Sequence, residues 1–147
     1  MFSIALFLHV LAATIWTGGH IVLSVVILPK VLREKSPQRL LEFESVYEKI
    51  GMPALLIQVA SGLYLAYRLL PDLSLWFNFV NPISQAVALK LTLLGLTVAF
   101  AIDARFRVIP KLSEKNLVDM AIHIVAVTLF SILFVGVGVS FRVGGIG

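Results

Sequence analysis

The chain has 147 residues, of which 59% are hydrophobic and only 14% are charged, a balance far from that of a soluble domain. Its formal net charge is +4, but the basic residues lie in the gaps between apolar runs and not among aromatic side chains, so composition gives no sign of a nucleic-acid partner. The lack of cysteine excludes disulfides, thiolate metal sites and thiol catalysis. We expect one membrane-embedded domain over residues 1–147, with the lipid bilayer as its main partner.

Four apolar runs have about the length that a helix needs to cross the hydrocarbon core, which is about 20 residues. Backbone groups in lipid must be hydrogen-bonded within the chain, so a helix is the expected form of each run. The expected fold is all-α, an integral membrane protein with four transmembrane helices in an antiparallel bundle. The predicted helices cover residues 2–28, 51–70, 82–104 and 116–141.

The stretch "SPQRLLEFESVYEK" between the first two runs predicts a further helix over residues 37–49. Ser36 is its expected N-cap and Pro37 its first residue. This helix either lies on the cytoplasmic membrane surface or extends the second transmembrane helix. The "GMP" at 51–53 is expected to break or bend it. Ser113 is the expected N-cap of the fourth helix.

Basic residues are concentrated on one side of the predicted membrane. Nine of the twelve Lys and Arg residues fall in the segments between the first and second helices and between the third and fourth. Loops rich in Lys and Arg stay in the cytoplasm. We therefore predict a multi-pass protein of the inner (cytoplasmic) membrane, with both termini on the outer or periplasmic side.

Two histidines stand out in the first apolar run. His9 and His20 are eleven residues apart, which puts them only about 20° apart around a helix and about 16 Å apart along it. Trp16 falls on the same stripe and is either a packing residue or part of a reactive site. Titratable residues in a membrane segment normally face the bundle interior. One face of the first helix therefore carries two imidazoles at two depths.

The other helices offer partners at matching depths. The fourth helix runs antiparallel to the first, so His123 is expected near the depth of His20 in the inner half of the membrane. Lys90 on the third helix is expected near the depth of His9 in the outer half. The predicted bundle thus has an inner pair, His20 with His123, and an outer pair, His9 with Lys90.

Facing histidines inside a helix bundle are suitable axial ligands for haem iron. His9, His20 and His123 are therefore the predicted metal ligands of one or two haem b groups. The small residues Gly19 and Gly62 leave room for a flat macrocycle or for close helix packing.

Two further side chains complete the predicted haem sites. Arg105 is placed to pair with a propionate at the inner interface. Lys90 either supplies a proton or charge beside an open iron site, or extends its ammonium toward the membrane surface.

The motif "LHVLAATIWTGGHI" resembles the first helix of the CopD-like membrane proteins, which are described as copper-resistance or copper-uptake components. It is also similar to the first helix of the HemJ-type protoporphyrinogen oxidases, small four-helix membrane proteins that bind haem b. In that second family a histidine precedes a tryptophan by seven residues, as His9 precedes Trp16. An apolar third helix there carries a functional lysine, which "VALKLTLLGL" matches at Lys90. The resemblance implies a haem-binding oxidoreductase with Lys90 and Trp16 near the reacting centre.

We thus expect a b-type cytochrome that carries out electron transfer or redox chemistry within the bilayer. The alternatives are a copper transport or resistance protein of CopD type, a protoporphyrinogen oxidase-like enzyme, and a structural subunit without cofactor. Copper pathways favour thiolate and thioether ligands, and of the three methionines Met120 lies near His123. The sequence identifies no electron donor or acceptor, and it leaves a homo-oligomer open.

Overall fold

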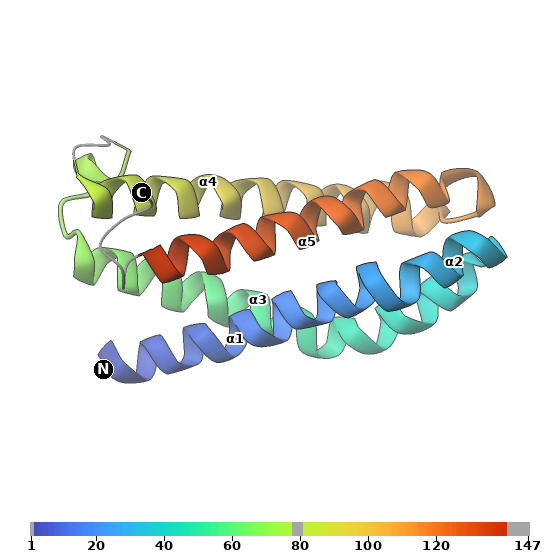
Figure 1. Ribbon diagram of the computed structural model, residues 1–147, viewed down its shortest axis with the longest axis horizontal. Coiled ribbons are helices and arrows are strands. Elements are labelled where there is room, and N and C mark those ends of the chain that lie inside the picture. The colour runs from blue at the N-terminus through green and yellow to red at the C-terminus, as the bar shows by residue number, and fades with distance from the viewer. Residues whose placement is uncertain (1, 78–80, 141–147) are drawn as a thin grey trace.

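The computed structural model describes residues 2–77 and 81–140, and within them the regular structure is entirely helical. Four helical spans run antiparallel along a common axis (Figure 1). Each is long and apolar enough to cross a membrane. The predicted all-α membrane fold with four transmembrane helices is therefore confirmed. The spans are Phe2–Glu34, Pro37–Leu69, Pro82–Lys111 and Glu114–Val139.

The first span continues beyond its predicted end at residue 28. It consists of α1 (Phe2–Val22), a π-helical turn (Leu23–Ile27) and α2 (Leu28–Glu34). Proline cannot donate an intrahelical hydrogen bond, but it is tolerated in the first turn of a helix. The wide π-helical turn places Pro29 in that position, at the start of α2. The chain leaves the helix only at Lys35, which has a left-handed backbone.

The second span is a single helix, α3 (Pro37–Leu69). Ser36 is its N-cap, as predicted, because its Oγ accepts a hydrogen bond from the backbone N–H of Arg39 at 3.3 Å. The segment 37–49 does not form a separate surface helix but extends the second transmembrane helix, which was one of the two predicted alternatives. The expected break at "GMP" does not end the helix, since Pro53 lies inside it.

The third span comprises α4 (Pro82–Asp103), a π-helical turn (Ala104–Val108) and a 3-10 turn (Ile109–Lys111). It therefore runs past its predicted end at residue 104. Asn81 is its N-cap, because its side chain accepts from the N–H of Ser84 at 2.8 Å.

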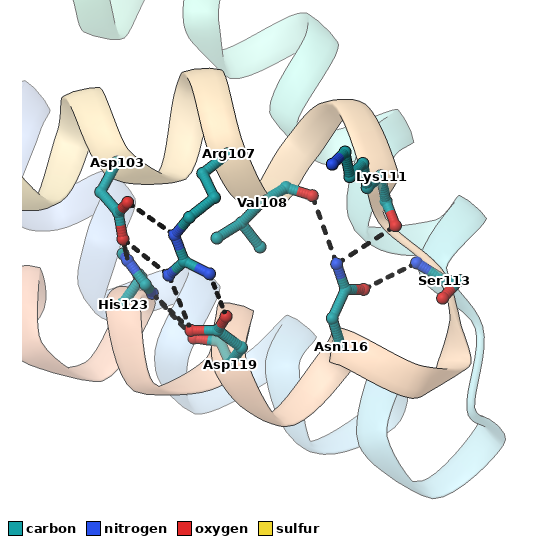
Figure 2. Close-up of polar contacts among 8 residues, drawn as sticks. All are labelled: Asp103, Arg107, Val108, Lys111, Ser113, Asn116, Asp119 and His123. Carbon is teal, nitrogen blue, oxygen red and sulfur yellow. Dashed lines mark hydrogen bonds and ion pairs between the residues drawn. The ribbon is translucent and has the colours of Figure 1, made fainter.

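The fourth span begins with a 3-10 turn (Glu114–Asn116) and continues as α5 (Leu117–Ser140). Ser113 caps that turn, which confirms its predicted role, and Asn116 accepts from the Ser113 N–H at 2.8 Å (Figure 2). The predicted end of this helix at residue 141 lies outside the described residues.

The helices form two layers, α1 with α3 and α4 with α5, and the layers meet where α1 contacts α5. The main apolar core lies at the end of the bundle where the basic turns are (Figure 1). Many large apolar side chains instead point outward, such as Phe7 and Phe106, which are 66% and 76% exposed. An apolar outer surface is what a lipid environment requires.

Candidate functional site

The three histidines of the predicted site lie on two helices and face different neighbours. His9 and His20 belong to α1 and contact residues of α3. His123 belongs to α5 and contacts α4. The predicted inner pair is therefore not formed in this structure, since the contacts of the His20 and His123 rings go to different helices.

His9 is held by one turn of α3. Its Nδ1 lies 3.0 Å from the carbonyl oxygen of Gln58 and 3.1 Å from the Oγ of Ser61. Gly62 makes room for the ring, because a Cβ at that position would lie 3.1 Å from His9 Cε1. We predicted that Gly62 leaves room for a haem macrocycle or for close helix packing. In the structure the His9 imidazole occupies the space beside Gly62.

Lys90 extends toward the inside of the bundle from α4 and is half-buried. Its Nζ would lie 3.7 Å from a Cβ built on Gly138 of α5. The ammonium is close enough to His9 for the two groups to interact electrostatically. Lys90 and His9 are thus within electrostatic range of each other, and their pairing in one functional site stays a prediction.

His20 lies deeper along α1, between two aromatic rings. Its Nδ1 is 2.8 Å from the carbonyl oxygen of Trp16. Its ring centroid is 4.4 Å from that of Trp16 and 5.7 Å from that of Tyr47, which meets it edge-on. The Tyr47 hydroxyl donates to the carbonyl oxygens of Ile15 and Trp16 at 2.9 and 3.1 Å. The ring of Tyr47 also lies against Gly19, where a Cβ would collide with it.

Trp16 is buried and forms a small core cluster with Leu55 and Val127. Its position explains how His20 is oriented, because the same residue supplies a ring contact and the carbonyl that binds Nδ1. In this structure Trp16 is a packing and positioning residue for His20.

In both His9 and His20, Nδ1 is hydrogen-bonded to a backbone carbonyl oxygen, and this contact fixes which ring nitrogen carries the proton. A carbonyl oxygen can only accept, so Nδ1 must carry the proton in both rings. Within the described residues neither Nε2 makes a hydrogen bond. A neutral imidazole in this state presents the Nε2 lone pair, and metal-bound histidines usually donate their other N–H to such a carbonyl. Both rings are therefore in the state of a histidine ligand.

His123 is in a different state, because both of its nitrogens are engaged (Figure 2). Nδ1 lies 2.8 Å from the Asp119 carbonyl oxygen, and Nε2 lies 2.6 Å from Asp103 Oδ2. The backbone carbonyl of Asp119 and the Asp103 carboxylate are both hydrogen-bond acceptors, so both ring nitrogens of His123 face acceptors. The ring is 5% exposed, and neither nitrogen is left for a metal.

Arg107 completes a four-residue ion cluster with His123, which joins α4 to α5 (Figure 2). Its guanidinium contacts Asp103 through two bonds of 2.7 Å and Asp119 at 3.0 Å. The cluster links α4 and its following π-helical turn to α5, and of its four side chains only His123 is buried, whereas Arg107 is 57% exposed.

Two other predicted residues have structural partners here. Arg105 forms an ion pair with Glu48 of α3 at 2.7 Å, which ties the π-helical turn after α4 to α3. Met120 is 5% exposed and packs in the main apolar core. Neither side chain contacts a histidine ring in the described part of the chain.

Sequence reasoning missed Tyr47, Asp103 and Asp119 as partners of the histidines. The four-residue spacings from Asp103 to Arg107 and from Asp119 to His123 are signals for helical side-chain pairs that could have been used. Tyr47 carries no such signal, because its contact with His20 joins residues on two different helices.

Three buried side-chain atoms have no hydrogen-bond partner in the described chain: Thr17 Oγ1, Gln58 Oε1 and Thr97 Oγ1. Unpartnered buried polar atoms are uncommon and are expected to face a water or another bound group. Gln58 is the informative one, since its backbone carbonyl binds His9. Gln58 thus binds His9 through its backbone carbonyl and also carries a buried side-chain oxygen without a partner in the described chain.

A bare metal ion needs several protein ligands close together. The described residues contain no group of three or more His, Asp or Glu side chains arranged to hold one. His9 and His20 each offer a single imidazole. Neither ring is joined by further His, Asp or Glu side chains in a group of three within the described residues.

Comparison with known proteins gives one clear result. Residues 41–141 match the family described as copper resistance protein D (CopD). No curated protein and no solved structure gives a significant match to the chain. The match covers more than half of the 147 residues and spans α4, α5 and most of α3. The CopD-like resemblance of the sequence is thereby confirmed, and the chain is a multi-pass membrane protein that belongs to the copper resistance protein D family.

Proposed function

We propose that this protein binds haem b within the bilayer and transfers electrons, with His9 and His20, about 16 Å apart along α1, each able to hold the iron of a separate haem. The observation that carries the proposal is the shared state of the two rings. Each donates Nδ1–H to a backbone carbonyl and leaves Nε2 without a partner in the described chain. His123 is left out of the ligand set, because both of its nitrogens are hydrogen-bonded.

The surroundings of His9 favour a haem over a bare cation. Lys90 is close enough for electrostatic interaction, and an ammonium opposes the binding of a copper ion beside it. The same ammonium would attract a propionate. Gln58 Oε1, buried and unpartnered, offers an acceptor in the same region.

The residues of this chain have separable roles in the proposal. Gln58 and Ser61 fix the tautomer and orientation of His9, and Trp16 and Tyr47 do the same for His20. Lys90 holds a positive charge or a proton beside His9. When bound, a haem supplies one-electron chemistry, and an open iron position would make the protein a haem-dependent oxidoreductase.

A second proposal, copper handling, is supported by the family match. Imidazole is a suitable ligand for copper. His9 and His20, at two depths on one face of α1, would then act as successive weak sites for an ion that crosses the membrane. Weak sites in series suit transfer better than storage.

The test is spectroscopy and metal analysis of the full-length protein purified in mild detergent. We expect a red preparation that gives a pyridine haemochrome of b type, with the haem content reduced in His20→Ala. A colourless protein with stoichiometric copper would replace the first proposal with the second. A protein without haem or copper, even after incubation with each, would overturn both.

We also propose that the end of the bundle with the basic turns faces the cytoplasm. Cysteines introduced at the exposed positions Gln38 and Lys115 should react with a membrane-impermeant thiol reagent only from the cytoplasmic side. A cysteine at Leu73, which is 60% exposed at the other end, should react only from outside. The reverse pattern would contradict the orientation.

A further inference from the structure

A groove opens on the outer surface between the first span and α3, near the basic end of the bundle. Its volume is about 390 Å³. The first span contributes Val26, Ile27 and Lys30, and α3 contributes Arg39, Phe43 and Val46. None of these side chains belongs to the histidine sites. The groove is therefore a separate feature that the proposed function does not use.

The chemistry of the groove changes with depth. The first span and α3 have 33 residues each, about 50 Å at 1.5 Å per residue, whereas the hydrocarbon core is about 30 Å thick. If the helices are centred, about six residues at each end of each helix therefore project beyond the core. Lys30 and Arg39 fall in the projecting parts, and Val26 and Val46 fall within the core.

The charged rim favours an anion. Lys30 is exposed and makes no ion pair within the described residues. Arg39 is paired through Nε with Glu34 at 3.1 Å. Glu42 also lines the groove, so the lining carries two positive charges and one negative charge. Glu34 offsets part of the charge of Arg39, and Lys30 is the lining cation without an ion pair in the described residues. The amino-terminal end of α3 begins two residues before Arg39 and adds its positive helix dipole.

The apolar floor favours an acyl chain. Val26 and Val46 are 52% and 70% exposed, and Ile27 and Phe43 pack against the main core from the same side. A molecule that fits both the charged rim and the apolar part of the groove has an anionic head group at the membrane surface and an apolar tail in the hydrocarbon core. Basic pockets between helices at a membrane surface are known to select anionic lipid head groups.

We propose that this groove is a binding site for an anionic phospholipid, with the phosphate beside Lys30 and Arg39 and an acyl chain along Val26 and Val46. Two cations near one phosphate give charge-assisted hydrogen bonds. The bound lipid would bridge the first span and α3 at the end where the chain turns between them.

The experiment uses the full-length protein and native mass spectrometry from detergent, with phosphatidylglycerol or phosphatidylcholine of the same acyl chains added. We expect retained phosphatidylglycerol on the wild type and little phosphatidylcholine. Lys30→Gln should weaken phosphatidylglycerol retention about five-fold. Lys115→Gln is the matched control, because it removes the same charge from an exposed site at the same end of the bundle, outside the groove.

Three outcomes would overturn the site. One is equal retention of both lipids by the wild type. Another is the same loss in Lys30→Gln and Lys115→Gln, which would indicate a general effect of net charge. The third is thermal stabilisation of the detergent-solubilised protein by glycerol phosphate equal to that by the whole lipid, which would indicate an anion site without a role for the groove floor. Circular dichroism of both variants in phosphatidylcholine alone checks that they remain folded.

Discussion

The histidines of α1 and the histidine of α5 show how one residue type takes two roles in the same membrane bundle. His9 and His20 each use one nitrogen, as a donor to a carbonyl oxygen. His123 uses both nitrogens and belongs to an ion cluster with Asp103, Arg107 and Asp119. The partners, and not the residue or its depth, separate the two roles.

This difference has a simple physical basis. An imidazole with a free Nε2 lone pair keeps its capacity to bind a metal, at the cost of an unsatisfied acceptor in an apolar region. A histidine ring with one nitrogen on a backbone carbonyl and the other on the Asp103 carboxylate has no nitrogen left for a metal, but it joins α5 to α4. We therefore expect variants at His9 and His20 to reduce mainly the cofactor content, and variants at His123 to reduce mainly the stability.

The largest effect is expected for the double variant His9→Ala/His20→Ala. Removal of both Nε2 ligands should lower the bound cofactor, haem or copper, at least tenfold, because few other donors remain near α1. Absorption spectra and metal analysis per folded protein measure this loss. Normal cofactor content in the double variant would contradict the role of the α1 imidazoles.

His123→Ala should mainly reduce stability. It removes a buried ring with two hydrogen bonds and leaves a cavity between α4 and α5, so we expect a loss of about 2–3 kcal/mol in the free energy of unfolding. Denaturant titration in detergent, followed by circular dichroism, measures it. Cofactor content per folded molecule should stay near that of wild type. Loss of cofactor without loss of stability would restore His123 as a ligand.

Lys90→Met tests the charge beside His9. A nearby cation disfavours oxidised iron, so its removal should lower the midpoint potential of a haem at His9 by on the order of 50 mV. A redox titration followed in the visible spectrum measures the shift, with Lys115→Met as a control that should leave the potential unchanged. An unchanged potential in both variants would show that Lys90 does not act on the site.

The smallest effect is expected for Arg105→Gln, which breaks the ion pair with Glu48. Because the Arg105 side chain is 51% exposed, the cost should be about 0.2–1 kcal/mol. Arg33→Gln, at another exposed position on the same end, controls for the lost charge. If Arg105→Gln instead removed the cofactor with stability intact, Arg105 would hold the propionate that the sequence suggested.

The sequence by itself determined the fold class, the number of spans and the caps at Ser36 and Ser113, because these depend on local properties. Twenty apolar residues in lipid must form a helix, and a serine directly before the first helical residue is a strong N-cap signal. Helix ends at Pro29 and Pro53 were harder to predict. A π-helical turn or a continuous long helix can accommodate proline, and the local sequence does not decide between these and a break.

Only the tertiary structure decided which histidines have a free nitrogen. Equal depth on neighbouring helices made His20 and His123 look like a pair, but depth fixes one coordinate and leaves the rotation of each helix about its axis undetermined. Packing set that rotation, turning His20 toward Tyr47 of α3 and His123 toward Asp103 of α4. Contacts between residues 20 positions or more apart depend on the whole bundle, which is why no local pattern predicts them.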